Sequence, residues 1–168
     1  TRGCAMDMAP ERGRGVLRRP PRLKQVFAER GRPLFFVTAC TRDRLRCLAN
    51  AKTHDAFRLF CERSPELAGV WVGRYVIMPD HLHAFVSAEG SESLARWVGS
   101  LKRHLARILR PDIGDGQVWQ QGFFDHLLRH GESYAEKWDY VFQNPVRAGL
   151  VEVADEWPFS GEIEAIEW

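Results

Sequence analysis

Runs of apolar residues with β-branched and aromatic side chains predict four strands. Residues 34–40 (LFFVTAC) are the first such run, and residues 70–78 and 81–88 are two more. The latter two are separated only by a Pro-Asp pair at 79–80, which suits a tight bend between neighbouring strands. Residues 123–129 supply a fourth, shorter run.

Apolar residues at helical spacing predict three helices. Residues 93–111 carry the clearest stripe, with apolar positions recurring at i, i+3, i+4 and i+7, and a loop is expected from Pro111. That stripe consists of Leu94, Trp97, Val98, Leu101, Leu105, Ile108 and Leu109. Residues 50–63 form a second helix, and residues 132–144 a third, which Pro145 ends or bends.

The resulting order, βαββαβα, predicts an α+β fold. It fits a ferredoxin-like or RRM-like sandwich, in which an antiparallel sheet carries helices on one face. Side chains alternate along a strand, so Leu82 would turn toward the helices while His81 and His83 face the other side.

Length and charge bear on domain organisation. The 168 residues, 45% of them apolar, suit one well-buried domain, which we assign to residues 31–160. Residues 1–46 hold 12 Lys/Arg against 4 Asp/Glu, a balance of +8, whereas residues 47–168 hold 12 against 18, a balance of −6. We therefore expect a basic, flexible arm at 1–30 and an acidic tail at 161–168. The arm suits a polyanion such as nucleic acid, although such a segment is also typical of a solvated extension.

Cysteine spacing and hydropathy narrow the cellular setting. The four cysteines form no CxxC pair, so neither a disulfide framework nor a cysteine metal site is indicated. No apolar run approaches the roughly 18 to 20 residues that span a bilayer, and the N-terminus lacks the core of a secretory signal. We expect a soluble, intracellular protein that does not contact membranes.

Two pairs of residues carry the candidate chemistry. His81 and His83 occupy alternate positions of one predicted strand, so both imidazoles can reach one metal ion. Tyr140 and Asn144 lie one helical turn apart on a polar helix face, where a phenol hydroxyl and an amide can approach a single point. Each has a simpler interpretation: histidines are common on surfaces, and Asn144, before Pro145, could merely cap a short helix.

Three motifs in this order carry a resemblance to a known family. They are Met78-Pro79-Asp80-His81-Leu82-His83, then Trp119-Gln120 with Phe124-Asp125-His126 and Arg129, then Tyr140 with Asn144-Pro145-Val146-Arg147-Ala148-Gly149-Leu150-Val151. Over about residues 30–160 the chain closely resembles the REP-associated tyrosine transposases, which are single-tyrosine HUH nucleases.

The resemblance implies a transesterase that cuts and rejoins single-stranded DNA through a 5′-phosphotyrosine. Tyr140 would be the nucleophile, and His81, His83 and Asn144 would bind Mg²⁺ or Mn²⁺. The DNA would be a REP-type palindrome folded as a hairpin. The resemblance also implies a bacterial cytoplasmic protein, bound to the nucleoid when on DNA, and either a monomer or a homodimer.

The predicted helix at 93–111 offers DNA contacts because basic side chains lie beside and opposite its apolar stripe. Lys102, Arg103 and Arg107 could meet phosphates, and Trp119 could stack on a base. Such a basic face could equally be solvated.

Two other functions fit the same residues. One is a catalytically silent module that binds single-stranded nucleic acid. The other is a metal-dependent hydrolase of a small substrate, in which His126 or Asp125 would join the histidine pair.

Overall fold

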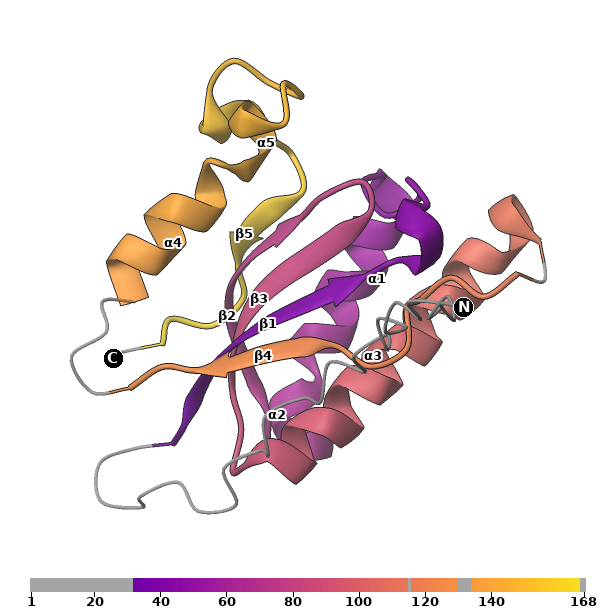
Figure 1. The fold of residues 1–168 in the computed structure, drawn as a ribbon. Helices are drawn as coiled ribbons and strands as arrows, with labels where there is room; N and C mark the ends of the chain where they lie inside the picture. The colour runs from indigo at the N-terminus through magenta and orange to yellow at the C-terminus, as the bar shows by residue number, and fades with distance from the viewer. Residues whose placement is uncertain (1–31, 115, 130–133, 167–168) are drawn as a thin grey trace, which may run out of the picture.

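One antiparallel sheet of five strands forms the centre of the computed structural model, which describes residues 32–114, 116–129 and 134–166 (Figure 1). The strands are β1 Leu34–Cys40, β2 Trp71–Ile77, β3 His81–Ser87, β4 Phe124–Leu127 and β5 Ser160–Glu162. Their order across the sheet is β4-β1-β3-β2-β5, so β3 occupies the middle. The basic arm expected at 1–30 lies outside the described residues.

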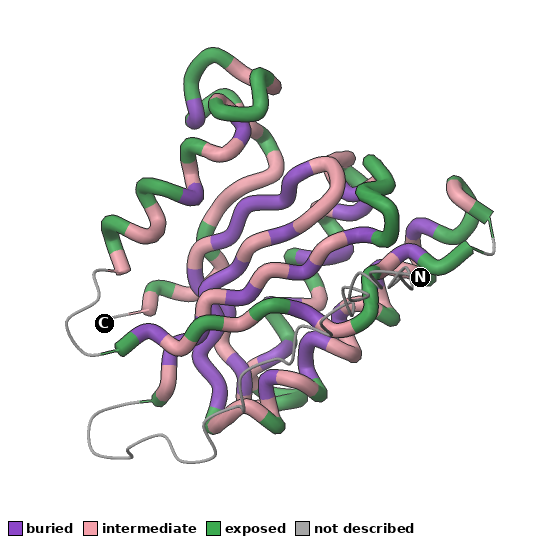
Figure 2. Tube along the Cα trace, in the orientation of Figure 1, coloured by how far each residue is buried: buried purple, intermediate pink, exposed green. Residues whose placement is uncertain are grey.

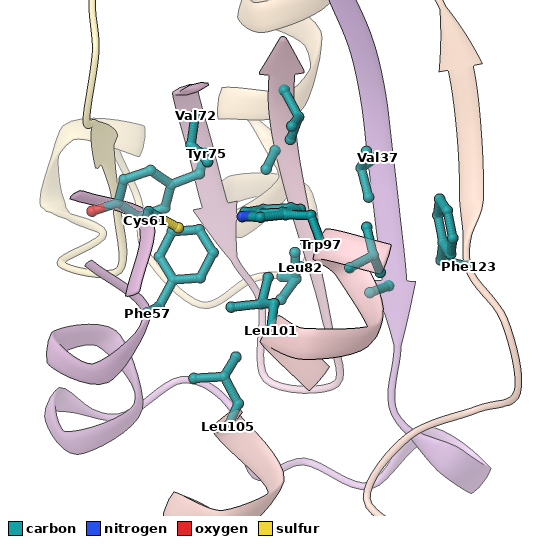
Figure 3. Close-up of a cluster of buried hydrophobic side chains, with 14 of the residues drawn as sticks. Val37, Phe57, Cys61, Val72, Tyr75, Leu82, Trp97, Leu101, Leu105 and Phe123 are labelled. Atoms are coloured by element: carbon teal, nitrogen blue, oxygen red, sulfur yellow. The ribbon is translucent and has the colours of Figure 1, made fainter. Parts of the chain in front are cut away.

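Three helices cover one face of the sheet: α1 Ala51–Glu62, α2 Ser64–Ala68 and α3 Ser91–Ile113. The main core lies between them and the sheet, where Phe57 of α1 and Trp97 and Leu101 of α3 meet Leu82 of β3 (Figure 3). Six of the seven residues of the predicted α3 stripe are buried and Ile108 is half-buried, because this side of the helix packs against the sheet.

The opposite face of the sheet carries α4 Tyr134–Phe142, which leads into the short α5 Asn144–Arg147 (Figure 1). The ring centroid of Phe85 on β3 lies 4.6 Å from that of Tyr134 and 6.5 Å from that of Trp138. Most of α4 is exposed or half-buried, with Val141 its one buried residue (Figure 2). Two 3₁₀ turns complete the described elements: η1 Arg42–Arg44 follows β1, and η2 Ala154–Glu156 precedes β5.

The predicted α+β fold is confirmed, although several details differ from the sequence analysis. The third helix lies on the sheet face opposite the other two. Helix α3 runs through Pro111 as far as Ile113 instead of giving way to a loop. The predicted helix at 132–144 is divided into α4 and α5, and its first two residues lie outside the described part. The strand expected at 123–129 shortens to β4.

Strand β5 was not predicted. β5 pairs with β2 through Arg74–Val76, so the sheet extends past the boundary at 160 at which we expected the domain to end. Trp157, just before it, donates a hydrogen bond from Nε1 to the carbonyl of Ile77 at 3.0 Å, and Phe159 packs against the main core. In the described ranges, no helix has the length and apolar character needed to cross a bilayer.

Candidate active site

The histidine pair is built by the pairing of β1 with β3. Thr38 lies opposite His83, and its hydroxyl oxygen is 2.8 Å from Nδ1 of that ring. His81 begins β3, and its Nδ1 is 2.6 Å from Oδ1 of Asp80. The two ring centroids are 4.8 Å apart with an angle of 80° between the ring planes. The predicted convergence of both imidazoles on one sheet face is thus observed.

The protonation of the pair follows from these partners. Burial favours a raised pKa for Asp80, but the hydrogen bond from His81 and the charges of His81 and Arg44 hold the pKa below its ordinary value. An ionised carboxylate only accepts, so Nδ1 of His81 donates the proton of this hydrogen bond. Burial of the second ring, with the charges of His81 and Arg147, lowers the pKa of His83 to about 3. His83 is therefore neutral near pH 7.

Such a pair fits a divalent metal ion. Metals bind the neutral imidazole, usually while the other ring nitrogen donates to a fixed partner. Among the described residues, no hydrogen bond occupies Nε2 of His81 or His83. No group of three or more His, Cys, Asp and Glu side chains in the described ranges could hold a metal. A third protein ligand would thus be of another type, such as an amide oxygen, and His126 and Asp125 do not extend the pair.

Tyr140 and Asn144 are joined by Arg147. Tyr140 is 68% exposed near the end of α4, on the helix face predicted from the sequence. The guanidinium of Arg147 lies 4.1 Å from the centre of the tyrosine ring. Its Nη2 donates to the carbonyl of Tyr140 at 2.6 Å and also to Oδ1 of Asn144. Gln143, not Asn144, occupies the cap position of α5, so the capping role considered for Asn144 is not observed.

Packing brings α4 to the sheet face that carries the histidines. The ring of Phe36 stacks on His83 with centroids 5.3 Å apart, and Nζ of Lys137 lies 5.4 Å over the same phenylalanine. Val141 and Trp138 pack with Val76 of β2 and with Met78, which follows that strand. Within the described residues no hydrogen bond joins Tyr140 or Asn144 to either histidine.

The structure separates the four candidate DNA contacts. Lys102 donates to the carbonyls of Gln120 at 2.6 Å and Gly122 at 2.7 Å, and its own carbonyl accepts from Nε1 of Trp119 at 2.8 Å. Trp119 also forms a β-bridge with Thr41, and the neighbouring Cys40 lies opposite His81. This cluster therefore lies at the end of the sheet where His81 begins β3.

The other two candidates lie apart from that cluster. Arg103 and Arg107 are exposed on α3, turned away from the sheet. The DNA-binding roles of all four residues stay predictions.

The sequence analysis gave no role to three residues that organise the site. Asp80 stands in the quoted motif, and an acid beside a histidine was a usable signal. Arg147 also stands in a quoted motif, where its spacing of three from Asn144 allows contact on one helical face. Thr38 could not be found, because its position opposite His83 depends on strand register.

The fold and the site are those of a transposase class. A family model described as "Transposase IS200 like" matches residues 35–143, and the chain belongs to this family.

Relatives refine the family assignment. The chain is 30% identical to the REP-associated tyrosine transposase of Escherichia coli over 91 residues. This match covers 53% of this chain and 52% of that protein. It is 29% identical over 142 residues to a Haemophilus influenzae protein assigned to the same group. That match covers 76% of this chain and 78% of that protein. The resemblance found in the sequence is confirmed.

A solved structure, of a REP-associated tyrosine transposase bound to a REP hairpin, supports the fold. It matches with a TM-score of 0.59 at 22% identity, over 81% of this chain and 82% of that one.

Proposed function

We propose that this transposase cuts and rejoins single-stranded DNA beside a REP-type hairpin, with Tyr140 as the nucleophile. The observation that carries the proposal is the exposed phenol of Tyr140, held by Arg147 on a helix that packs against the sheet face that carries the histidine pair. Two relatives carry the name REP-associated tyrosine transposase, and the matched structure holds a REP hairpin, which supports the choice of DNA.

The proposed step exchanges one phosphodiester for another. The phenol oxygen of Tyr140 bonds to phosphorus, and the bond from phosphorus to the 3′ oxygen of the DNA breaks. The phenol proton passes to water, which the exposure of the side chain admits, and the 3′ oxygen takes up a proton. Reversal of these changes with a new 3′ hydroxyl rejoins a strand, since the energy of the phosphodiester is retained in the phosphotyrosine.

His81 and His83 would hold Mg²⁺ or Mn²⁺ through their Nε2 atoms, with Oδ1 of Asn144 as a third ligand. The metal would polarise the scissile phosphate and stabilise charge on the leaving oxygen. The protein orients the ligands, because Asp80 and Thr38 hold the two imidazole rings in place. Imidazole ligands prefer Mn²⁺ to Mg²⁺, so we expect Mn²⁺ to support activity better in vitro.

The test is incubation of the full chain and Mn²⁺ with a single-stranded oligonucleotide that folds into a hairpin with unpaired flanks. We expect a denaturation-resistant protein–DNA adduct that maps to Tyr140, is lost on chelation of metal, and is absent from Tyr140→Phe. Tyr134→Phe is the matched control, because its oxygen only accepts from the backbone N–H of Arg74 at 3.4 Å.

Tyr134→Phe should form the adduct as the wild type does. If the protein binds the hairpin but forms no adduct, it is a catalytically silent binding module and the proposed function is wrong. An adduct on Tyr134 would refute the assignment of the nucleophile.

A further inference from the structure

The guanidinium of Arg147 occupies a position that the proposed reaction leaves unexplained. It stacks 4.1 Å from the ring centre of Tyr140 and hydrogen-bonds the backbone of that residue and the side chain of Asn144. Both hydrogen bonds use Nη2. Within the described residues, no hydrogen bond occupies Nη1 or Nε, and the side chain is exposed.

An exposed guanidinium with unused N–H groups is suited to a phosphate. Its planar fork donates two parallel hydrogen bonds to phosphate oxygens, and its charge does not titrate in the working range of a protein. A phosphate bound to this fork would lie beside the ring of Tyr140, on the side of the molecule that carries the histidines. The positive charge of Arg147 also contributes to the lowered pKa of His83.

We propose that Arg147 binds the scissile phosphodiester of the DNA and, until DNA arrives, holds Tyr140 and Asn144 in place. This inference rests on the proposed function, because it takes Tyr140 as the nucleophile. Each of the two parallel N–H pairs of a guanidinium includes one N–H of Nη2, so a bidentate phosphate displaces one of the two acceptors that Nη2 now holds. We take the displaced acceptor to be Oδ1 of Asn144, which then becomes available as a ligand only when substrate is present.

A phosphate-binding role for Arg147 can be distinguished from a role that only stabilises the helix end. A purely structural arginine would affect folding and the position of α5 but would not count as a phosphate contact. Each phosphate contact contributes about 0.7 to the slope of log affinity against log salt for single strands. The salt slope is therefore a readout that a structural role would not move.

The experiment measures hairpin-oligonucleotide binding across a salt series in chelator, on Tyr140→Phe proteins that cannot cleave. Adding Arg147→Gln should lower the slope by about 0.7 to 1, whereas Arg147→Lys should keep it because the charge remains. Arg58→Gln is the control, because that exposed arginine lies on α1, beneath the other sheet face, and pairs with Glu62 at 3.5 Å. Its slope should equal that of the parent protein.

Two measurements with Tyr140 intact complete the test. Arg147→Gln should form the covalent adduct about 100-fold more slowly than wild type, and Arg147→Lys should also be slow because it lacks the fork. Without DNA, Mn²⁺ should bind Arg147→Gln at least as tightly as wild type, since Asn144 is then free.

An unchanged salt slope in Arg147→Gln, or weaker Mn²⁺ binding, would overturn the inference. Failure of the proposed function gives a different result, because wild-type protein would then form no adduct at all. The slope of log affinity against log salt, measured in chelator, would still show whether Arg147 contacts a phosphate.

Discussion

His83 makes the stability of the protein depend on pH in a way that can be calculated. Its pKa is lowered from 6.5 to about 3, first by burial and then by the charges of His81 and Arg147. A histidine with a folded-state pKa below its unfolded one takes up its proton mainly in the unfolded chain. Its favourable contribution is fully present above pH 6.5 and is lost as the pH falls toward 3.

The size of the effect follows from the part of this interval that an experiment covers. Each pH unit between the two pKa values costs about 1.4 kcal/mol of folding free energy. Lowering the pH from 7 to 5 crosses about 1.5 of these units, so His83 alone should remove about 2 kcal/mol. For a domain whose total stability is about 5 to 15 kcal/mol, such a loss is readily measured.

Urea unfolding in chelator at pH 7 and pH 5 measures the effect in the wild type and in His83→Gln. Glutamine is neutral at both values and can retain a hydrogen bond to Thr38, so the variant should lose about 2 kcal/mol less than the wild type on acidification. His54, whose pKa burial and Arg58 also lower, titrates in both proteins and cancels. Equal losses in the two proteins would refute the conclusion that burial holds His83 neutral.

Two further predictions concern residues that support the site. Asp80→Asn should weaken Mn²⁺ binding, measured by titration without DNA, about 10- to 100-fold, because the carboxylate that orients His81 is lost; unchanged affinity would remove Asp80 from the metal site. Lys102→Ala should lower the free energy of unfolding by about 1 to 3 kcal/mol in urea, because the carbonyls of Gln120 and Gly122 lose their shared donor. If its stability is unchanged but its salt slope for DNA falls by about one, Lys102 is a phosphate contact and not a brace.

The sequence predicted those parts of the molecule that depend on local spacing. Strand alternation put His81 and His83 on one face, and the helical stripe of residues 93–111 identified the buried side of α3. Helical periodicity also separated the exposed Tyr140 from Tyr134, which packs on Phe85. These inferences succeeded because each depends on the geometry of one element.

The features that the sequence did not predict depend on contacts between elements. An apolar helix face indicates that α4 packs on something, but not which side of the sheet it covers. Thr38 meets His83 only through the register of β1 against β3. β5 is three residues long and includes Gly161, so it has neither the length nor the β-branched side chains of a recognisable strand. Pro111 misled us because α3 tolerates it in its last turn, before Gly114.

The two edges of the sheet have a consequence for self-association. β1 is covered along only Phe35–Thr38 by β4, and β2 only along Arg74–Val76 by β5. The outermost strands therefore have four and three residues, and each carries an acid, Asp125 or Glu162. Long, flat, apolar edges invite another chain to add a strand, whereas short, charged ones offer few backbone hydrogen bonds to an incoming copy. The fold thus disfavours edge-to-edge aggregation at both ends of a sheet whose central strand carries the histidines.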